Sequence, residues 1–400
     1  APAAGDAADR SLARRRGGGD MTTILLAGGG TGGHVFPLIA IAEQLARWSP
    51  TTSLRFVGTA RGLEARVIPA RGWPLDLLAI EPIKGRAIAG RIRAGAIAAR
   101  AMVAATSLIR LHRPALVVSI GSYAAGPVSL AAAALGVKVA LVEPNRVAGL
   151  TQRLLSPLAR RIYVGFPEAL AGLGDKGRAF GVPLRAGFDP APLAAAKGRP
   201  VRVLVTGGSQ GAQAINERMP EVVAALVGER KADVRVLHQA GRGHAEATRA
   251  RYDHALDRSG NSPLIVEVVE FIDDVPAKLR DCDLLIARAG AMTCAEACAV
   301  GRPSVLIPYP FAADDHQAAN ADALARAGAA IAIRQSDATI DALVAAIAPL
   351  VTDPARRLAM ADAARARSVP DAASCIARDL LQLAAIPAAR EAAAAAPEVA

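Results

Sequence analysis

Short apolar segments alternate with helix-forming segments along this chain, and the alternation starts afresh near its middle. Such alternation is typical of parallel sheets covered by helices. Each series opens with an apolar strand, a glycine-rich loop and a helix. The sequence therefore predicts an α/β protein with two doubly wound, Rossmann-like domains, in which ligands bind beyond the carboxyl ends of the strands.

The predicted strands fall into two sets separated by a segment rich in Gly and Pro at residues 181–190. The first set comprises residues 23–27, 54–59, 75–80, 115–120, 137–143 and 161–166. The second set comprises residues 201–206, 234–239, 264–271, 284–287, 304–308 and 330–334. We interpret the segment between them as a linker.

The first glycine-rich loop carries five glycines between residues 28 and 33 and is followed by His34. Amides at the start of a helix, together with the helix dipole, favour an anion there. A bare turn with a surface histidine is the alternative interpretation of this loop taken singly. Similar loops at residues 121–127, 207–212 and 288–293 favour phosphorylated ligands instead.

Two nucleotide-binding classes are disfavoured by what surrounds these loops. None continues into the Gly-Lys-Ser/Thr of an ATP-hydrolysing loop. Gly28, Gly30 and Gly33 match the dinucleotide fingerprint, but no acidic residue stands between Glu43 and Glu64 to hold a ribose. A nicotinamide-dependent enzyme is therefore a poor second hypothesis.

Composition bounds the compartment and the class of protein. The 400 residues contain 3% aromatics, and no run approaches the ~20 strongly apolar residues of a membrane-spanning helix. We find no secretory signal and expect reduced thiols in the cytoplasm.

Cys294 and Cys298 lie four apart without ligands at zinc spacing, which favours core packing. Asp314 and Asp315 suggest a helix N-cap rather than a metal site.

A basic segment stands out within the net charge of +11, because residues 82–142 hold eight Lys or Arg and no acidic residue. Isoleucines interleave with the first cations, as in a surface that docks on anionic lipids. The alternative is a solvent-exposed helix whose cations only keep the protein soluble. The scarcity of aromatic residues for base stacking argues against nucleic-acid binding. The predicted docking residues are Ile83, Lys84, Arg86, Ile88, Arg91, Ile92 and Arg93.

Six ordered motifs carry a resemblance to a known family. They are Gly29–Pro37, Gly121–Pro127, Asn145 with Ala148–Leu150, Gly207–Gly211, Phe271–Asp274 and Asp314–Gln317. From about Thr22 to Leu383 the chain resembles the bacterial peptidoglycan glycosyltransferases of GT-B type. These enzymes transfer N-acetylglucosamine from UDP-N-acetylglucosamine, with inversion, to the 4-hydroxyl of undecaprenyl-pyrophosphoryl-N-acetylmuramyl-pentapeptide (lipid I to lipid II).

The resemblance implies a domain plan. Residues 1–20 would be a disordered leader, 21–185 the acceptor and membrane-docking domain, and 186–369 the UDP-sugar domain. A helix at 370–386 would return to the first domain, and 387–400 would be a flexible tail. The enzyme would work without metal or cofactor, peripherally, on the cytoplasmic face of the inner membrane. Its implied partners are the two substrates, an anionic membrane surface and other cell-wall synthesis proteins, but no nucleic acid.

The resemblance also assigns site residues. The implied catalytic groups are His34 and Glu143, either of which is a candidate base. The implied donor contacts are Thr31, Gly32, Gly33, Asn145, Arg185, Ser209, Ile272, Ala291, Met292, Thr293, Cys294, Ala295, Glu296 and Gln317. The implied acceptor-diphosphate contacts are Gly29, Gly30, Gly121, Ser122 and Tyr123.

Two positions depart from the family pattern: Val142 replaces a frequent His, and Arg146 stands where Gly is common. The first departure removes the basis for a role of position 142 but leaves Glu143 and Asn145 in place. The residue types nevertheless agree with the chemistry, because His titrates near neutrality and suits a general base. A carboxylate at Glu296 suits ribose hydroxyls. The alternative function is another UDP-sugar enzyme of this architecture, either an epimerase or a transferase with a soluble acceptor.

Overall fold

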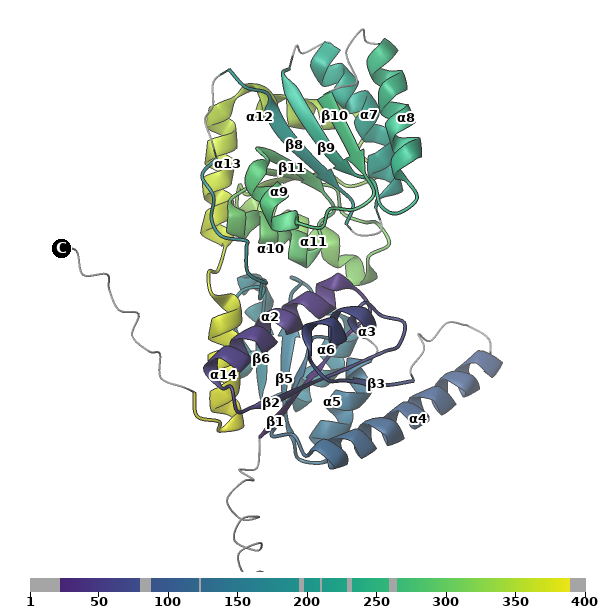
Figure 1. The fold of residues 1–400 in the computed structure, drawn as a ribbon, viewed down its shortest axis with the longest axis vertical. Helices are drawn as coiled ribbons and strands as arrows, with labels where there is room; N and C mark the ends of the chain where they lie inside the picture. The colour runs from purple at the N-terminus through teal and green to yellow at the C-terminus, as the bar shows by residue number, and fades with distance from the viewer. Residues whose placement is uncertain are drawn as a thin grey trace, which may run out of the picture. The chain divides into compact units, whose positions relative to one another are not determined.

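The computed structural model describes residues 22–79, 88–121, 124–193, 198–208, 211–228, 232–258 and 265–388, with backbone only at 88–96 and 98. These residues form two compact units (Figure 1). Of the described residues, those within 1–142, 154–161 and 374–400 form the first unit, and those within 143–153 and 162–373 form the second. The sequence boundary at residue 185 therefore falls within the second unit.

The first sheet has the strand order β3-β2-β1-β4-β5-β6-β7. Its strands are β1 (Thr23–Ala27), β2 (Ser53–Gly58), β3 (Leu75–Leu77), β4 (Leu116–Ser119), β5 (Lys138–Glu143), β6 (Arg161–Val164) and β7 (Gly177–Arg178). Neighbouring strands from β3 to β5 pair in parallel, and so do β6 and β7. Central strand β1 is buried on both faces, which explains the unbroken apolar run Ile24, Leu25 and Leu26.

The helices of this half begin after the strand ends. They are α2 (Gly32–Trp48), α3 (Glu64–Val67), α4 (Ile88–His112), α5 (Ala125–Ala134) and, from the far end of the chain, α14 (Ala372–Ala384). Helix α6 (Leu150–Leu155) follows β5, and its residues 150–153 belong to the second unit. The N-terminal part of α4 projects away from the rest of the first unit (Figure 1). Part of its exposed surface is apolar, since Val103 and Leu111 are 69% and 75% exposed.

Helix α14 packs on the first unit. Its residues Ile376, Leu380 and Leu381 are buried. Trp48 Nε1 on α2 donates to Ser374 Oγ at 3.2 Å, and Lys138 Nζ donates to the Leu383 carbonyl at 2.7 Å. These contacts tie the last helix to the end of α2 and to the start of β5.

The second sheet has the order β10-β9-β8-β11-β12-β13 and is parallel. Its strands are β8 (Val201–Thr206), β9 (Val234–Gln239), β10 (Val266–Val269), β11 (Leu284–Ala287), β12 (Ser304–Leu306) and β13 (Ala330–Ala332). Its helices are α7 (Gln213–Gly228), α8 (Ala245–Arg258), α9 (Val275–Asp281), α10 (Ala291–Val300), α11 (His316–Arg326), α12 (Ile340–Thr352) and α13 (Pro354–Arg367).

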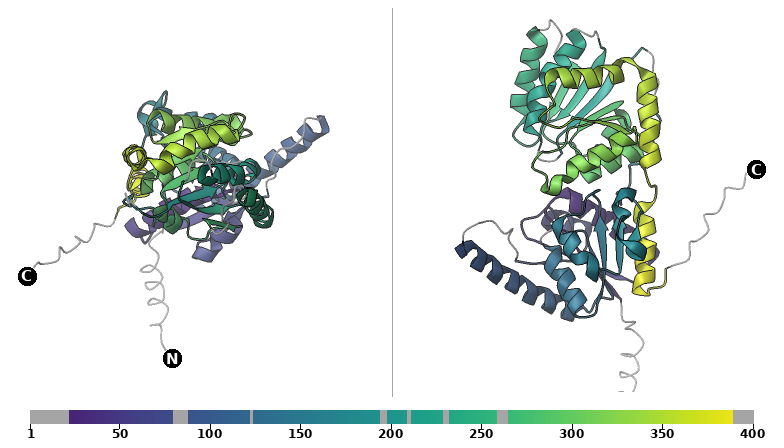
Figure 2. Two further views of the ribbon diagram at one scale, coloured as in Figure 1. Left: turned by 90° about the horizontal axis from the view of Figure 1, so that it is seen from above. Right: turned by 180° about the vertical axis from the view of Figure 1, so that it is seen from behind.

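Two apolar clusters fill the second unit, one on each face of its sheet. Helices α7, α8 and α12 contribute to the first cluster, and α9, α10, α11 and α13 contribute to the other. Figure 2 shows the helical layers from behind and above. Two doubly wound sheets are thus confirmed. Four strands, β1, β8, β9 and β11, have the predicted bounds, most others are shorter or shifted, and β7 was not predicted.

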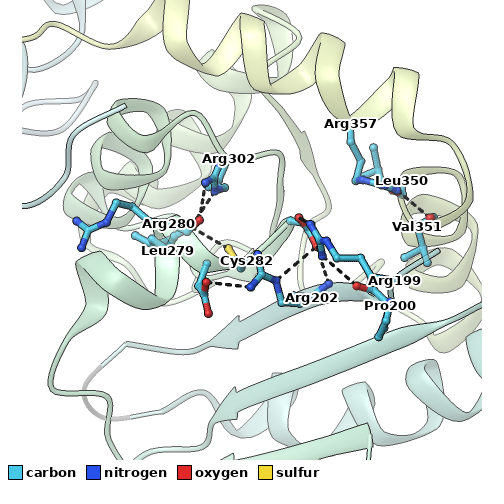
Figure 3. A network of polar contacts seen from close by, with 12 residues as sticks. Arg199, Pro200, Arg202, Leu279, Arg280, Cys282, Arg302, Leu350, Val351 and Arg357 are labelled. Carbon is cyan, nitrogen blue, oxygen red and sulfur yellow. Dashed lines mark hydrogen bonds and ion pairs between the residues drawn. The ribbon is translucent and has the colours of Figure 1, made fainter. Parts of the chain in front are cut away.

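Buried arginines hold the edge of the second sheet that lies opposite the strand carboxyl ends (Figure 3). Arg302 donates to the Leu279 and Arg280 carbonyls at 2.8 and 2.7 Å, which caps the end of α9. Arg357 donates to the Leu350 and Val351 carbonyls at 2.6 and 2.8 Å, near the end of α12. A guanidinium at a helix C-terminus satisfies the last carbonyls and opposes the dipole.

Candidate functional site

The first glycine-rich loop lies at the carboxyl edge of the first sheet. Gly28 N–H donates to the Val57 carbonyl of β2 at 3.1 Å, and Ile120 N–H after β4 donates to the Ala27 carbonyl at 3.2 Å. A Cβ on Gly28 would lie 2.5 Å from the Ile120 side chain, so glycine is needed for this close approach. The strand order reverses at β1 and β4, which is where such sheets bind ligands.

Helix α2 begins at Gly32, with Thr31 in extended conformation at its N-cap. Gly32 and Gly33 supply the first two amides, for which a helix has no internal partner. His34 is the third residue of the helix, and its partly exposed side chain stands at the same end. The structure thus brings together Thr31, Gly32, Gly33 and His34 at one helix N-terminus.

The glycines assigned to the acceptor diphosphate lie around that loop. Gly121 follows β4 and adopts a φ of 82°, and it is buried. Gly30 adopts a φ of 96°, and its N–H donates to Glu64 Oε2 at 2.8 Å. This amide is therefore engaged within the protein. Ser122 and Tyr123 lie outside the described residues.

Glu143 is buried at the end of β5 and holds the loop that follows it. Its Oε1 accepts from Asn145 N–H at 2.9 Å and from Asn145 Nδ2 at 3.0 Å, and its Oε2 accepts from Gly149 N–H at 3.3 Å. Burial raises the pKa of the Glu143 carboxyl, although the Asn145 and Gly149 donors oppose that shift. Both oxygens of this carboxyl thus have partners within the loop.

Asn145 has a further partner within the second unit. Asn320 on α11 is fully buried, and its Nδ2 donates to Asn145 Oδ1 and to the Ala289 carbonyl, each at 3.1 Å. Gln317, one turn earlier on the same helix, accepts from Tyr309 N–H at 3.0 Å. Helix α11 therefore links the loop that carries Asn145 to the turn before α10.

Asp315 occupies the predicted N-cap position of α11, but its side chain does not cap the helix. Asp314 and Asp315 both adopt positive φ values, 51° and 50°, and the Asp315 side chain makes no capping hydrogen bond. Asp314 Oδ2 pairs with Arg153 at 3.1 Å, and Asp315 Oδ2 pairs with Arg334 at 2.9 Å. Ion pairs to distant arginines therefore replace the local cap.

The predicted run Ala291–Glu296 forms the first turns of α10, which begins after Gly290. Cys294 is buried, and burial raises the pKa of its thiol, as expected for a core cysteine. Ile272 lies in the same apolar cluster as Cys294. Short loops after β10 and β11 therefore place the Ile272 and α10 positions close together in the second unit.

Glu296 is the electrostatically unusual group of this region. Part of its surface reaches solvent, yet burial of the remainder raises its pKa from 4.5 to about 7. The charge of Arg185 acts in the opposite direction, so these two predicted donor contacts are near one another. Arg185 also lies over the Phe188 ring, with its guanidinium carbon 5.6 Å from the ring centroid.

The glycine-rich loop at residues 207–212 follows β8. Gln239 Nε2 donates to the Gly208 carbonyl at 3.0 Å, and a Cβ on Gly211 would lie 2.0 Å from the Ala240 carbonyl oxygen. Ser209 lies outside the described residues. The residues around it show that the end of β9 holds this loop.

The predicted docking residues fall mostly beyond what can be described. Ile83, Lys84 and Arg86 lie outside the described residues, and Ile88, Arg91, Ile92 and Arg93 are described only as backbone of α4. Within the described part of the chain, no helix is both long enough and apolar enough to span a membrane. The same part holds no cluster of three or more His, Cys, Asp or Glu suited to a metal.

Sequence reasoning missed two buried polar residues, Glu64 and Asn320. Each joins loops that are distant in sequence, so no local motif contains both partners. Two signals were present. Glu64 stands two residues after Gly62 in a short segment after β2, and Asn320 stands on the inward face of α11, among buried alanines.

Two family models match this chain. Residues 24–164 match the glycosyltransferase family 28 N-terminal domain, and residues 202–376 match the glycosyltransferase family 28 C-terminal domain. A Sorangium cellulosum protein is 50% identical over 360 residues, covering 89% of this chain and 87% of that protein. Its name is UDP-N-acetylglucosamine--N-acetylmuramyl-(pentapeptide) pyrophosphoryl-undecaprenol N-acetylglucosamine transferase.

Two solved structures place the fold. Acinetobacter baumannii MurG matches with a TM-score of 0.74 at 32% identity, covering 90% of this chain and 99% of that chain. The UDP-GlcNAc 2-epimerase of Neisseria meningitidis, bound to UDP-GlcNAc, matches with a TM-score of 0.66 at 14% identity, covering 90% and 100%. The second similarity concerns the fold only, so the architecture does not separate transferases from epimerases.

Proposed function

The chain belongs to glycosyltransferase family 28, and from this premise we propose the reaction that it performs. It is a UDP-N-acetylglucosamine-dependent glycosyltransferase of peptidoglycan synthesis. It transfers N-acetylglucosamine to undecaprenyl-pyrophosphoryl-N-acetylmuramyl-pentapeptide, which converts lipid I to lipid II. The observation that carries this function is the 50% identity with a transferase of that name over most of both chains.

The donor is proposed to bind at the start of α10. The first amides of α10 and the helix dipole favour binding of the diphosphate. Their interaction with the phosphates becomes stronger as negative charge develops on the leaving UDP. Glu296, one turn into the helix, accepts hydrogen bonds from the ribose hydroxyls. Ile272 lies at the uracil, and Arg185 and Gln317 complete the donor contacts. The remaining donor assignments, Thr31–Gly33, Asn145 and Ser209, stay part of this proposal.

His34 is proposed as the general base that takes the proton from the 4-hydroxyl of N-acetylmuramic acid. Its imidazole stands at the start of α2, beside the glycine-rich loop whose Gly29 and Gly30 are assigned to the acceptor diphosphate. Glu143 is assigned to holding its own loop, because both of its oxygens accept hydrogen bonds from residues 145 and 149. Attack on the anomeric carbon from the side opposite UDP gives inversion.

Membrane docking is proposed for the segment 83–93 and the projecting helix α4. The acceptor carries a polyprenyl chain that stays in the bilayer, so the enzyme must approach the surface. Cations on 84–93 meet anionic headgroups, and isoleucines enter the interface. This arrangement makes the protein peripheral on the cytoplasmic face of the membrane. Contacts with other cell-wall synthesis proteins remain part of the proposal.

The test is an assay of sugar transfer to a lipid-linked muramyl-pentapeptide acceptor, with UDP-N-acetylglucosamine and UDP-glucose as competing donors. Transfer from UDP-N-acetylglucosamine with release of one UDP per sugar is the expected result. A second arm incubates the enzyme with the donor and no acceptor. Epimerisation of the donor sugar there, without transfer in the first arm, would favour the epimerase alternative and overturn the proposal.

A further inference from the structure

Glu64 is a buried carboxylate that no part of the proposed mechanism uses. Its side chain is 1% exposed and lies in the first turn of α3. Oε2 accepts from Gly30 N–H at 2.8 Å, and Oε1 accepts from Thr59 N–H at 2.8 Å and from Thr59 Oγ1 at 2.9 Å. The carboxylate therefore joins the loop after β1 to the loop after β2.

Three glycines leave the space that this carboxylate fills. A Cβ on Gly29, Gly58 or Gly62 would lie 2.1, 2.5 or 2.0 Å from a Glu64 side-chain atom. These contacts are too short for any side chain, and the atoms they meet are held by hydrogen bonds rather than free to move. Gly29 thus serves to admit Glu64, whatever it also contributes to a ligand.

Both backbone polar groups of Gly30 are hydrogen-bonded within the protein. Its N–H donates to Glu64, and its carbonyl accepts from Leu63 N–H at 3.2 Å. Gly30 has a φ of 96°, a conformation that needs glycine and that a loop keeps only when its surroundings fix it. The next residue, Thr31, is the N-cap of α2.

We infer that Glu64 is a positioning residue that clamps the glycine-rich loop and thereby sets the start of α2 and His34. It also removes the Gly30 amide from the groups that can bind an anion. The kinetic part of this inference rests on the proposed function, but the clamp itself does not.

The sharpest variant is Glu64→Gln, which keeps the shape of the side chain. A carboxylate accepts at both oxygens, whereas an amide presents one NH₂ group. That NH₂ would face either the Gly30 N–H or the Thr59 N–H, so one buried donor loses its acceptor. Glu43→Gln is the matched control, because Glu43 is exposed on α2.

The first readout is amide hydrogen exchange, which requires no activity. We expect faster exchange in Glu64→Gln for the peptide 28–38 and unchanged exchange for β8 in the second unit. Thr59→Val removes only the hydroxyl donor and should produce a smaller change in the same peptide. Unchanged exchange at 28–38 in both variants would overturn the clamp, whether or not the wild-type protein transfers sugar.

The second readout separates positioning from general damage. We expect kcat to fall by ~10- to 100-fold in Glu64→Gln, the scale for misplaced reacting groups, while the Kd for UDP stays within about twofold. Glu43→Gln should match wild type. A normal kcat in Glu64→Gln would refute the positioning role. An equal loss of kcat and of UDP affinity would also refute it, because that indicates a merely structural residue. Absence of transfer in the wild type would instead count against the proposed function.

Discussion

At the scale of single residues, the three glutamates described above show how surroundings decide the role of a carboxylate. Glu64 and Glu143 are buried, and both oxygens of each accept hydrogen bonds from nearby loops. Glu296 has a different setting, because part of its surface reaches solvent while burial of the remainder raises its pKa to about 7. A perturbed, partly exposed carboxyl at the start of a helix is the one of the three that suits ligand binding.

His34→Ala tests the proposed base. The substitution removes the imidazole at the third position of α2 and leaves the backbone amides in place. We expect turnover to fall by ~10²-fold or more, the usual scale for a positioned acid–base group, with little change in donor affinity. Steady-state kinetics with both substrates provide the measurement. Turnover near that of wild type would rule out His34 as the base.

Glu296 predicts a pH dependence of stability and of UDP binding. With a folded pKa of about 7 against 4.5, the folded protein retains a proton that the unfolded chain loses between these values. The stability contribution of this group is therefore full below pH 4.5 and is lost as the pH rises through 7. UDP affinity should change in the opposite direction, because the ionised carboxyl is the better acceptor for ribose hydroxyls.

Thermal denaturation and calorimetric titration between pH 5 and 8 provide the measurements for this prediction. Glu296→Gln should bind UDP more weakly, and its stability and UDP affinity should both change less with pH than those of the wild type. If the variant instead collapses in melting temperature at every pH, Glu296 is a structural residue and its assignment to the ribose is wrong.

At the scale of elements, helix ends in the second unit depend on buried arginines. Arg302→Met should lower the free energy of unfolding by ~2–4 kcal/mol, because the carbonyls at the end of α9 lose a charged donor. Arg356→Met is the control, since that side chain is 65% exposed. Chemical denaturation compares the two variants. Equal stabilities would show that water replaces the Arg302 contacts without cost.

Replacing Lys84, Arg86, Arg91 and Arg93 by Ser tests docking through the basic segment. Each cation near an anionic surface contributes ~1 kcal/mol to binding, so the variant should no longer bind anionic vesicles. It should still transfer sugar to a short-chain, water-soluble acceptor. The control changes Arg235, Arg242, Arg251 and Arg326, all exposed in the second unit, to Ser. Vesicle flotation measures binding. Equal loss of binding in both variants would show that only net charge matters.

At the scale of the whole molecule, the two units should respond separately to a ligand of one of them. UDP at a hundred times its Kd stabilises the unit that binds it by about 2.7 kcal/mol. We expect calorimetry to show two transitions, with UDP raising only that of the second unit. Equal shifts in both transitions would contradict the assignment of the uridine and diphosphate contacts to the second unit.

Features that depend on residues close together in the sequence could be predicted, and features that depend on residues far apart could not. The two sheets could be predicted, because apolar runs and glycine loops are local patterns. The start of α10 could be predicted for the same reason. Glu64 could not, because its partner Gly30 lies 34 residues away. The cap assigned to Asp315 failed because Arg334 takes its carboxylate and the backbone is left-handed there.

Helix α14 has a consequence for the order in which the protein is made. Domains usually fold as the ribosome releases them, with the N-terminal one first. Here Ile376, Leu380 and Leu381 are buried in the first unit, so that unit lacks part of its core until residue 384 has left the ribosome. The second unit ends at residue 373 and is therefore the first to have all its residues available. Translation thus completes the two units in the reverse of their order along the chain. Until α14 is released, the apolar surface of the first unit that this helix covers stays exposed.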